Sequence, residues 1–139
     1  MAAHSRRNYA EGRLHMRIVR TLNRIEGILF YHPPNEALRT PRIAMTMRAF
    51  GTSKAAPDLF IFGIEGKQLK PICVELKRPG GKASEEQTAW LTALESMGWR
   101  ALVIDNYESM LDELQEHGYI DAEWRNMIWE DEEPYVKEP

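Results

Sequence analysis

Apolar residues near the start of the chain recur at helical intervals. They are separated by four, four and three positions: Leu14, Ile18, Leu22 and Ile25. This spacing predicts an amphipathic helix over residues 9–25. Glu11 lies within about 20° of Ile18 and Leu22 on a helical wheel, so a carboxylate begins the apolar stripe. Considered alone, this helix favours a simple explanation, in which the acid is stabilised by the helix N-terminus.

The rest of the chain alternates between runs with strand character and helical patterns. Strands are predicted at 28–31, 59–64, 71–77 and 100–105, and further helices at 40–51, 84–97, 108–117 and 121–129. The second helix would begin at Thr40-Pro41 and end at Gly51. This order predicts an α/β fold, in which a mixed central β-sheet is flanked by α-helices.

The helix at 84–97 carries a capping signal. Ser84 is followed three residues later by Gln87, which is the capping-box pattern. Gly98 is expected to end this helix. Its core-facing side chains are expected to be Leu91, Leu94 and Met97.

The strands at 59–64 and 71–77 are expected to form a hairpin whose turn is centred on Gly66 and Lys67. The numbers of paired residues would then sum to 133, which places Asp58 opposite Glu75. Carboxylates in such a pair lie roughly 4.5–5.5 Å apart at Cβ and repel each other. A divalent cation between them explains the arrangement, and Lys77 would lie on the same face of the sheet.

The hard oxygen ligands of this pair suit Mg²⁺ or Mn²⁺ better than zinc. The four histidines of the chain have no zinc-ligand spacing, and a single cysteine cannot form a thiolate cluster. A Ser–His–Asp arrangement is not indicated by any motif. The glycines of "RPGGK" follow a strand without a phosphate-binding pattern, so they predict a turn.

Charge is distributed unevenly along the chain. Residues 1–82 contain 15 Lys and Arg against 6 Asp and Glu, whereas residues 83–139 contain 3 against 15. A basic half suggests a polyanionic partner such as nucleic acid. Two oppositely charged faces that only maintain solubility would give the same counts. The last residues, 129–139, are expected to be an acidic tail on a single domain spanning 1–128.

The composition is typical of a globular protein that does not span a membrane. The chain has no apolar run long enough for a bilayer, and its first residues lack the apolar centre of a signal peptide. Cys73 is the only cysteine, which excludes an internal disulfide. We expect a cytoplasmic protein.

Two long segments resemble a known family. They are "HPPNEALRTPRIAMTMRAFGTSKAAPDLFIF" and "ICVELKRPGGKASEEQTAWLTALESMGW". Together they resemble the VRR-NUC domain, a branch of the PD-(D/E)xK nuclease superfamily, in its stand-alone, phage-type form. The resemblance runs from about Glu11 to about residue 118, and Pro57-Asp58, Glu75-Leu76-Lys77 and Gln87 occupy the motif positions. One departure is Ala56, where many members have glycine.

The resemblance implies a restriction-endonuclease-like core and Mg²⁺- or Mn²⁺-dependent hydrolysis of DNA phosphodiester bonds. It implies that the metal is bound by Asp58, Glu75, the Leu76 carbonyl and Glu11. Lys77 would orient the attacking water and offset charge on the phosphate. Gln87 has two compatible roles, as capping-box partner and as a site residue.

The DNA contacts and the type of DNA are less constrained by the sequence. Five residues are candidates for phosphate contacts, with plain solvent exposure as the alternative: Asn35, Arg39, Arg42, Lys54 and Arg78. The expected substrate is branched DNA, such as a four-way (Holliday) junction, cut by a homodimer. The alternatives are a non-specific or nicking endonuclease, and a catalytically idle DNA-binding module. The four tryptophans are expected in the core or an interface.

Overall fold

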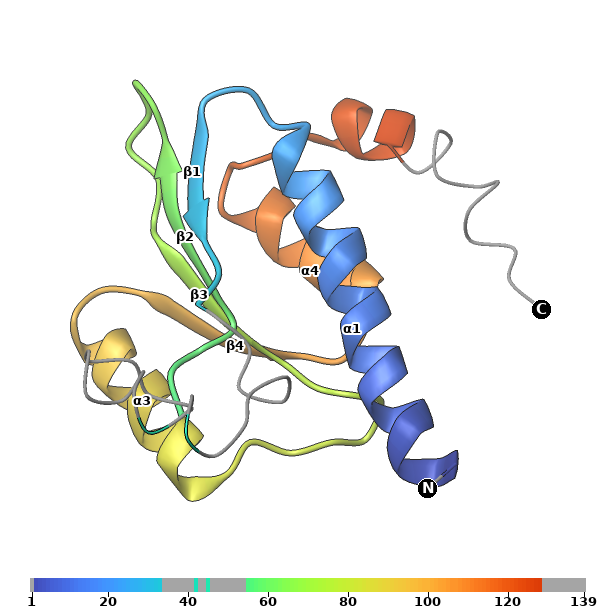
Figure 1. The fold of residues 1–139 in the computed structure, drawn as a ribbon. Helices are drawn as coiled ribbons and strands as arrows, with labels where there is room; N and C mark the ends of the chain where they lie inside the picture. Colours follow the sequence, from blue (N-terminus) through green and yellow to red (C-terminus); the bar gives the residue numbers. More distant parts are fainter. Residues whose placement is uncertain (1, 34–41, 43–44, 46–54, 129–139) are drawn as a thin grey trace.

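The computed structural model describes residues 2–33, 42, 45 and 55–128 (Figure 1). The elements follow in the order α1 (Ala2–Asn23), β1 (Ile28–Tyr31), β2 (Leu59–Ile64), β3 (Ile72–Leu76), α3 (Glu85–Ser96), β4 (Arg100–Ile104) and α4 (Tyr107–Glu116). A short helix at 122–128 follows. Residues 42 and 45 are helical, in agreement with the helix predicted at 40–51, but most of that segment and the tail at 129–139 lie outside the described residues.

The four strands form one sheet in the order β1-β2-β3-β4. The β1–β2 and β2–β3 pairs are antiparallel, and the β3–β4 pair is parallel. The chain reaches β4 from β3 through α3, as a parallel connection requires. Helices α1 and α4 lie on one side of the sheet and α3 lies on the other (Figure 1). The predicted fold class, a mixed sheet flanked by helices, is confirmed.

The hydrophobic core lies between the sheet and the pair α1–α4. Strands β2, β3 and β4 each direct alternate side chains into it, as expected for strands with one face on the core. The sheet contributes Leu59, Ile61, Ile72, Val74, Leu76, Leu102 and Ile104 to this cluster. The helices contribute Ile18, Leu22, Met110, Leu111 and Leu114. This packing fixes the β3 alternation, so Cys73 and Glu75 face the α3 side.

The register between β2 and β3 matches the prediction, although the turn does not. Leu59 pairs with Val74 and Ile61 pairs with Ile72, so partner numbers sum to 133. The turn is centred on Glu65 and Gly66, because the Lys67 amide donates to the Ile64 carbonyl at 3.0 Å. Gly66 has φ 81°, which suits the second central position of such a turn. The chain then continues without ladder pairing to Pro71, which has no N–H to donate, and β3 begins at Ile72.

Helix α1 begins earlier than predicted, at Ala2 and not at residue 9. The first residues are polar, so no apolar periodicity marks this extension. The consequence for Glu11 is direct: it lies near the middle of α1, where the dipole of a helix N-terminus no longer acts. The simple explanation for this acid is therefore wrong.

The predicted core face of α3 is also wrong in part. Met97 is 73% exposed, Leu91 and Leu94 are half-buried, and no residue within Glu85–Ser96 is fully buried. On this side of the sheet, the Trp99 ring also meets Phe60 and Phe62 edge-on, with centroids 5.6 Å apart.

The other tryptophans differ in their surroundings. Trp124 packs against the core, Trp90 is 38% exposed, and Trp129 lies outside the described residues. The prediction of a core or interface position therefore holds best for Trp124. No helix among the described residues has the length and apolar character to cross a bilayer.

Candidate active site

The register brings two carboxylates together where β2 begins and β3 ends. Asp58 immediately precedes β2, and its Oδ2 accepts a hydrogen bond from the Leu76 amide at 2.7 Å. This bond holds Asp58 across from the end of β3, beside Glu75. The Glu75 side chain is on the α3 face of the sheet and is only 4% exposed. The pair that the sequence predicted is thus present in the fold.

The two carboxylates perturb each other. Burial, as the larger cause, and the neighbouring Asp58 charge together raise the pKa of Glu75 to about 8. Lys77 opposes the shift, because its Nζ lies 3.5 Å from Glu75 Oε1. Lys77 lowers the pKa of Glu75 by less than burial and repulsion from Asp58 raise it, so the positive charge beside the pair is insufficient. Such an imbalance favours a further cation at the pair, and strongly perturbed acids of this kind are typical of functional sites.

The position of Lys77 depends on the turn that follows it. The Lys77 amide donates to the Ile104 carbonyl at 2.9 Å, which extends the pairing with β4 by one residue. The Gly81 amide donates to the Arg78 carbonyl at 2.8 Å, closing a turn with Pro79 first and Gly80, at φ 79°, second. These residues are those of a type II turn. A Cβ at Gly81 would lie 3.0 Å from the Arg78 carbonyl oxygen, so a larger residue there would crowd this turn.

Gln87 has both of the geometries expected of it. Its backbone amide donates to Ser84 Oγ at 3.1 Å, and its Oε1 accepts from the Ser84 amide at 2.9 Å, which completes the capping box. Its Nε2 also donates to Glu75 Oε1 at 2.9 Å. One side chain therefore begins α3 and orients the buried carboxylate.

Glu11 approaches the same region from α1. Its Oε1 accepts a hydrogen bond from the Arg78 amide at 3.2 Å, so it contacts the residue that follows Lys77. The helix thereby brings a third carboxylate to the end of β3. Among the described residues, however, the oxygens of Glu11, Asp58 and Glu75 do not all come within 4.8 Å of one another.

Two histidines beside Asp58 were not singled out from the sequence. The rings of His15 and His32 meet edge-on with centroids 5.0 Å apart. Burial and the neighbouring His32 lower the pKa of His15, and Asp58 opposes that change. His15 is four residues after Glu11 and so shares its face of α1, which was the available signal. His32 follows β1 and reaches the site only through the tertiary fold.

The donor set fits a hard divalent ion. Asp58 and Glu75 offer carboxylate oxygens that Mg²⁺ and Mn²⁺ prefer, and a cation there would relieve the repulsion that raises the pKa of Glu75. The Leu76 carbonyl was also expected to be a ligand. The Leu76 amide donates to Asp58, and this bond fixes the local backbone. Metal binding by the Leu76 carbonyl stays a prediction.

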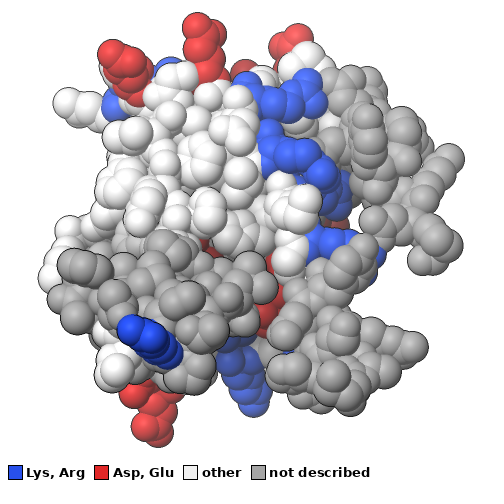
Figure 2. Space-filling model, in the orientation of Figure 1, with Lys and Arg blue, Asp and Glu red and all other residues white. Residues whose placement is uncertain are grey.

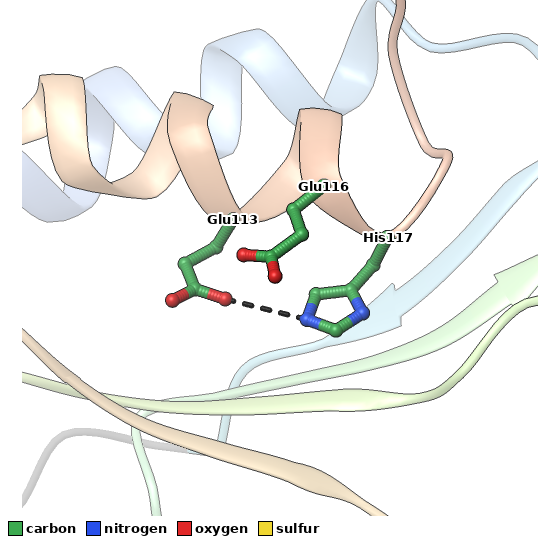
Figure 3. A group of neighbouring side chains, drawn as sticks. All are labelled: Glu113, Glu116 and His117. Carbon is green, nitrogen blue, oxygen red and sulfur yellow. Dashed lines mark ion pairs between the residues drawn. The ribbon is translucent and has the colours of Figure 1, made fainter.

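Another group of possible ligands lies at the end of α4, as shown in Figure 3. Glu113, Glu116 and His117 have ligand atoms within 4.8 Å of one another. Glu113 accepts from Arg100 through both oxygens, at 2.9 and 3.2 Å, and lies 3.4 Å from His117 Nε2. The Arg100 bonds lower the pKa of Glu113. Because a guanidinium already occupies this carboxylate, we interpret the group as an ion pair that joins β4 to α4.

The residues predicted to contact DNA are only partly described. Arg42 is exposed and Arg78 is half-buried, with its backbone facing Glu11. Three others, Asn35, Arg39 and Lys54, lie outside the described residues. The replacement of a family glycine by Ala56 causes no backbone strain, since no described residue other than glycine has a positive φ.

Comparison with known proteins agrees with this geometry. A solved structure titled "VRR_NUC domain protein" superposes with a TM-score of 0.60 over 81% of this chain and 90% of that chain, at 15% sequence identity. That likeness shows a shared fold. No curated protein has a matching sequence. The profile of the VRR-NUC domain matches residues 11–108, which is most of the chain and contains every predicted site residue. The chain therefore belongs to the VRR-NUC family of nuclease domains.

Proposed function

We propose that this protein is a metal-dependent endonuclease that hydrolyses DNA phosphodiester bonds at the Asp58–Glu75 pair. The observation that carries the proposal is the buried Glu75 carboxylate, which lies beside a second acid and 3.5 Å from the Lys77 ammonium. Two acids and a lysine at one strand end supply both a cation site and a fixed positive charge. Membership of a nuclease family makes phosphodiester hydrolysis the reaction that uses both.

Each residue of the group has a distinct part in this proposal. Asp58 and Glu75 would hold Mg²⁺ or Mn²⁺, with the Leu76 carbonyl and Glu11 completing the site. A bound ion would polarise the phosphate and lower the pKa of a water molecule. Lys77 offsets the negative charge that grows on the phosphate oxygens during attack. Gln87 keeps Glu75 in position through its amide, and Glu11 fixes the backbone that follows Lys77.

The finer part of the proposal concerns the substrate. A domain with a single catalytic group cuts one strand at a time, whereas resolution of a four-way junction needs two coordinated cuts. A twofold dimer presents two equivalent sites and matches the symmetry of such a junction. We therefore propose that a homodimer of this chain prefers branched DNA to linear duplex.

The test uses labelled linear, flapped and four-way DNAs incubated with Mg²⁺, Mn²⁺ or EDTA, with the oligomeric state measured in parallel by light scattering. The proposal predicts metal-dependent cutting and a preference for the four-way DNA by a dimer. Equal cutting of all DNAs by a monomer would contradict the preference for branched DNA and would support a non-specific endonuclease instead. An absence of cutting under every metal condition would contradict the proposed activity.

A further inference from the structure

Apolar side chains are exposed on the α3 side of the sheet, over β1 and β2. Helix α3 packs against β3 and β4, and β1 forms the opposite edge of the sheet. Leu29 and Tyr31 of β1 are 64% and 54% exposed, and Phe62 of β2 is 45% exposed. Phe60 and Trp99 are half-buried beside them. These five residues are called the aromatic patch below.

The β1–β2 register brings the patch together. Tyr31 lies directly opposite Phe60, and Leu29 lies opposite Gly63, which has no side chain to cover it. The rings of Phe60 and Phe62 are stacked with centroids 6.4 Å apart. The alternate side chains of both strands pack into the core on the other face. The patch is therefore one continuous surface of the sheet.

The patch carries no charge of its own. Strands β1 and β2 contain no Lys, Arg, Asp or Glu. Figure 2 shows a white area without charged side chains at the upper left of the molecule, where Figure 1 places these strands. Proteins that stack unpaired bases on aromatic rings combine the rings with a positively charged groove. The lack of cations in both strands argues against bases as the occupant and favours an apolar protein surface.

A second copy of the chain fits this surface. In a twofold contact a surface meets its own copy, so any charge near the axis faces a like charge. Other described surfaces would repel their own copies in this way, since α1 exposes Arg13 and Arg20 and α3 exposes Glu85 and Glu86. The uncharged patch does not. Its tyrosine, phenylalanines and tryptophan are residue types that are enriched at interfaces, where Lys, Glu and Asp are depleted.

We propose that the aromatic patch is the surface through which two copies of this chain associate. The inference rests on the proposed homodimer and names its interface. The patch shares the α3 face of the sheet with Glu75, and Phe60 is only two residues after Asp58. At about 3.3 Å per residue, Phe62 lies about 13 Å along β2 from Asp58. Association through the patch therefore brings both copies of the candidate site near the twofold axis, where two strands of a junction can be cut together.

The test measures association of the full chain without cleavage. Sedimentation equilibrium in EDTA gives the dimer dissociation constants of the wild-type protein, Leu29→Glu and Phe62→Glu. The proposal predicts a wild-type dimer and at least about tenfold higher dissociation constants for both variants, because each copy then places a carboxylate in an apolar contact. Unchanged dissociation constants in both variants would overturn it. A wild-type protein that stays monomeric up to high micromolar concentrations would overturn it as well.

Met16→Glu is the matched control. Met16 lies on α1 and is 64% exposed, as Leu29 is, so the same apolar exposure is lost and the same charge is added outside the patch. This variant should keep the wild-type dissociation constant, and an increase equal to that of Leu29→Glu would contradict the proposal. Circular dichroism checks folding. If Phe62→Glu is unfolded because its ring contacts are lost, Leu29→Glu decides alone.

Binding of unpaired bases is the competing outcome. Fluorescence anisotropy with labelled single-stranded DNA, in the same EDTA buffer, measures it directly. If Leu29→Glu stays dimeric but binds this DNA more weakly than Met16→Glu does, the patch is a nucleic-acid surface and the inference is overturned.

Cleavage assays with Mn²⁺ distinguish this inference from the proposed function. A monomeric Leu29→Glu keeps a complete candidate site, so it should still nick linear duplex but lose paired cuts on opposing strands of a four-way junction. If Leu29→Glu dissociates the dimer but the wild-type protein cuts no DNA, the interface stands and the nuclease proposal fails. If the wild-type protein cuts DNA and both patch variants stay dimeric, the nuclease stands and the patch is excluded as the interface.

Discussion

Glu75→Gln gives the sharpest test of the paired carboxylates, because its effect on stability should depend on pH. The folded state raises the pKa of Glu75 from an ordinary 4.5 to about 8. Folding therefore favours the protonated acid, and the stabilisation is complete below about pH 4.5 and is lost as the pH rises through about 8. At about 1.36 kcal/mol per pKa unit, the upper limit of the change is about 5 kcal/mol.

Glutamine reproduces the protonated state at every pH. Its amide can donate to Asp58 as a protonated Glu75 would, and its Oε1 can still accept from Gln87. In the absence of metal, the variant and the wild-type protein should have similar stability near pH 5. Near pH 9 the variant should be more stable by a part of that 5 kcal/mol, since structural relaxation reduces the full value. A difference of about 2 kcal/mol would raise Tm by roughly 5 °C or more.

The assay is thermal unfolding in EDTA between pH 5 and 9 at constant ionic strength. Glu65→Gln, an exposed acid in the turn after β2, is the matched control and should follow the wild-type curve. Parallel curves for Glu75→Gln and the wild-type protein would refute the reasoning. Destabilisation by Glu75→Gln at high pH would refute it as well.

The remaining predictions concern catalysis and capping. Lys77→Ala should nearly abolish cleavage while DNA affinity in EDTA stays within a few-fold, because the lysine acts on the transition state; full activity would remove it from the mechanism. Glu11→Gln should lower the single-turnover rate of cleavage by at least about tenfold, which corresponds to about 1.4 kcal/mol of activation barrier. An unchanged rate would mean that the hydrogen bond from the Arg78 amide to Glu11 is purely structural. Ser84→Ala should cost about 1 kcal/mol of stability, measured by urea unfolding, but keep most activity. Gln87→Ala should lose both stability and activity, and equal activities of these two variants would exclude a site role for Gln87.

The strands could be predicted from sequence because apolar runs and turn residues mark them clearly. The β2 prediction, residues 59–64, matches its observed bounds, Leu59–Ile64. The register was correct even though the turn was wrong, and alternation fixed only its parity, that is, which side chains face the core. An odd register sum keeps Leu59 and Val74 on the core face together, and the observed sum of 133 is the odd sum that sets Asp58 opposite Glu75.

Features that depend on long-range contacts could not be predicted in the same way. The bond from Glu11 to the Arg78 amide joins residues 67 positions apart, and no local pattern encodes it. The same applies to His15 and His32, which meet beside Asp58 only after α1 and β1 have packed. Met97 was expected in the core because helical spacing identifies an apolar face, but spacing alone does not tell how much of that face is covered.

Metal binding by the paired acids is the claim on which the account depends most directly. Manganese binding can be measured by electron paramagnetic resonance and, in the same buffer, the metal dependence of DNA cleavage can be followed. The account predicts that wild-type protein binds Mn²⁺ in the concentration range that supports cleavage, and that Asp58→Asn weakens binding and cleavage together. Undiminished Mn²⁺ binding in both Asp58→Asn and Glu75→Gln would place the metal elsewhere and contradict the account.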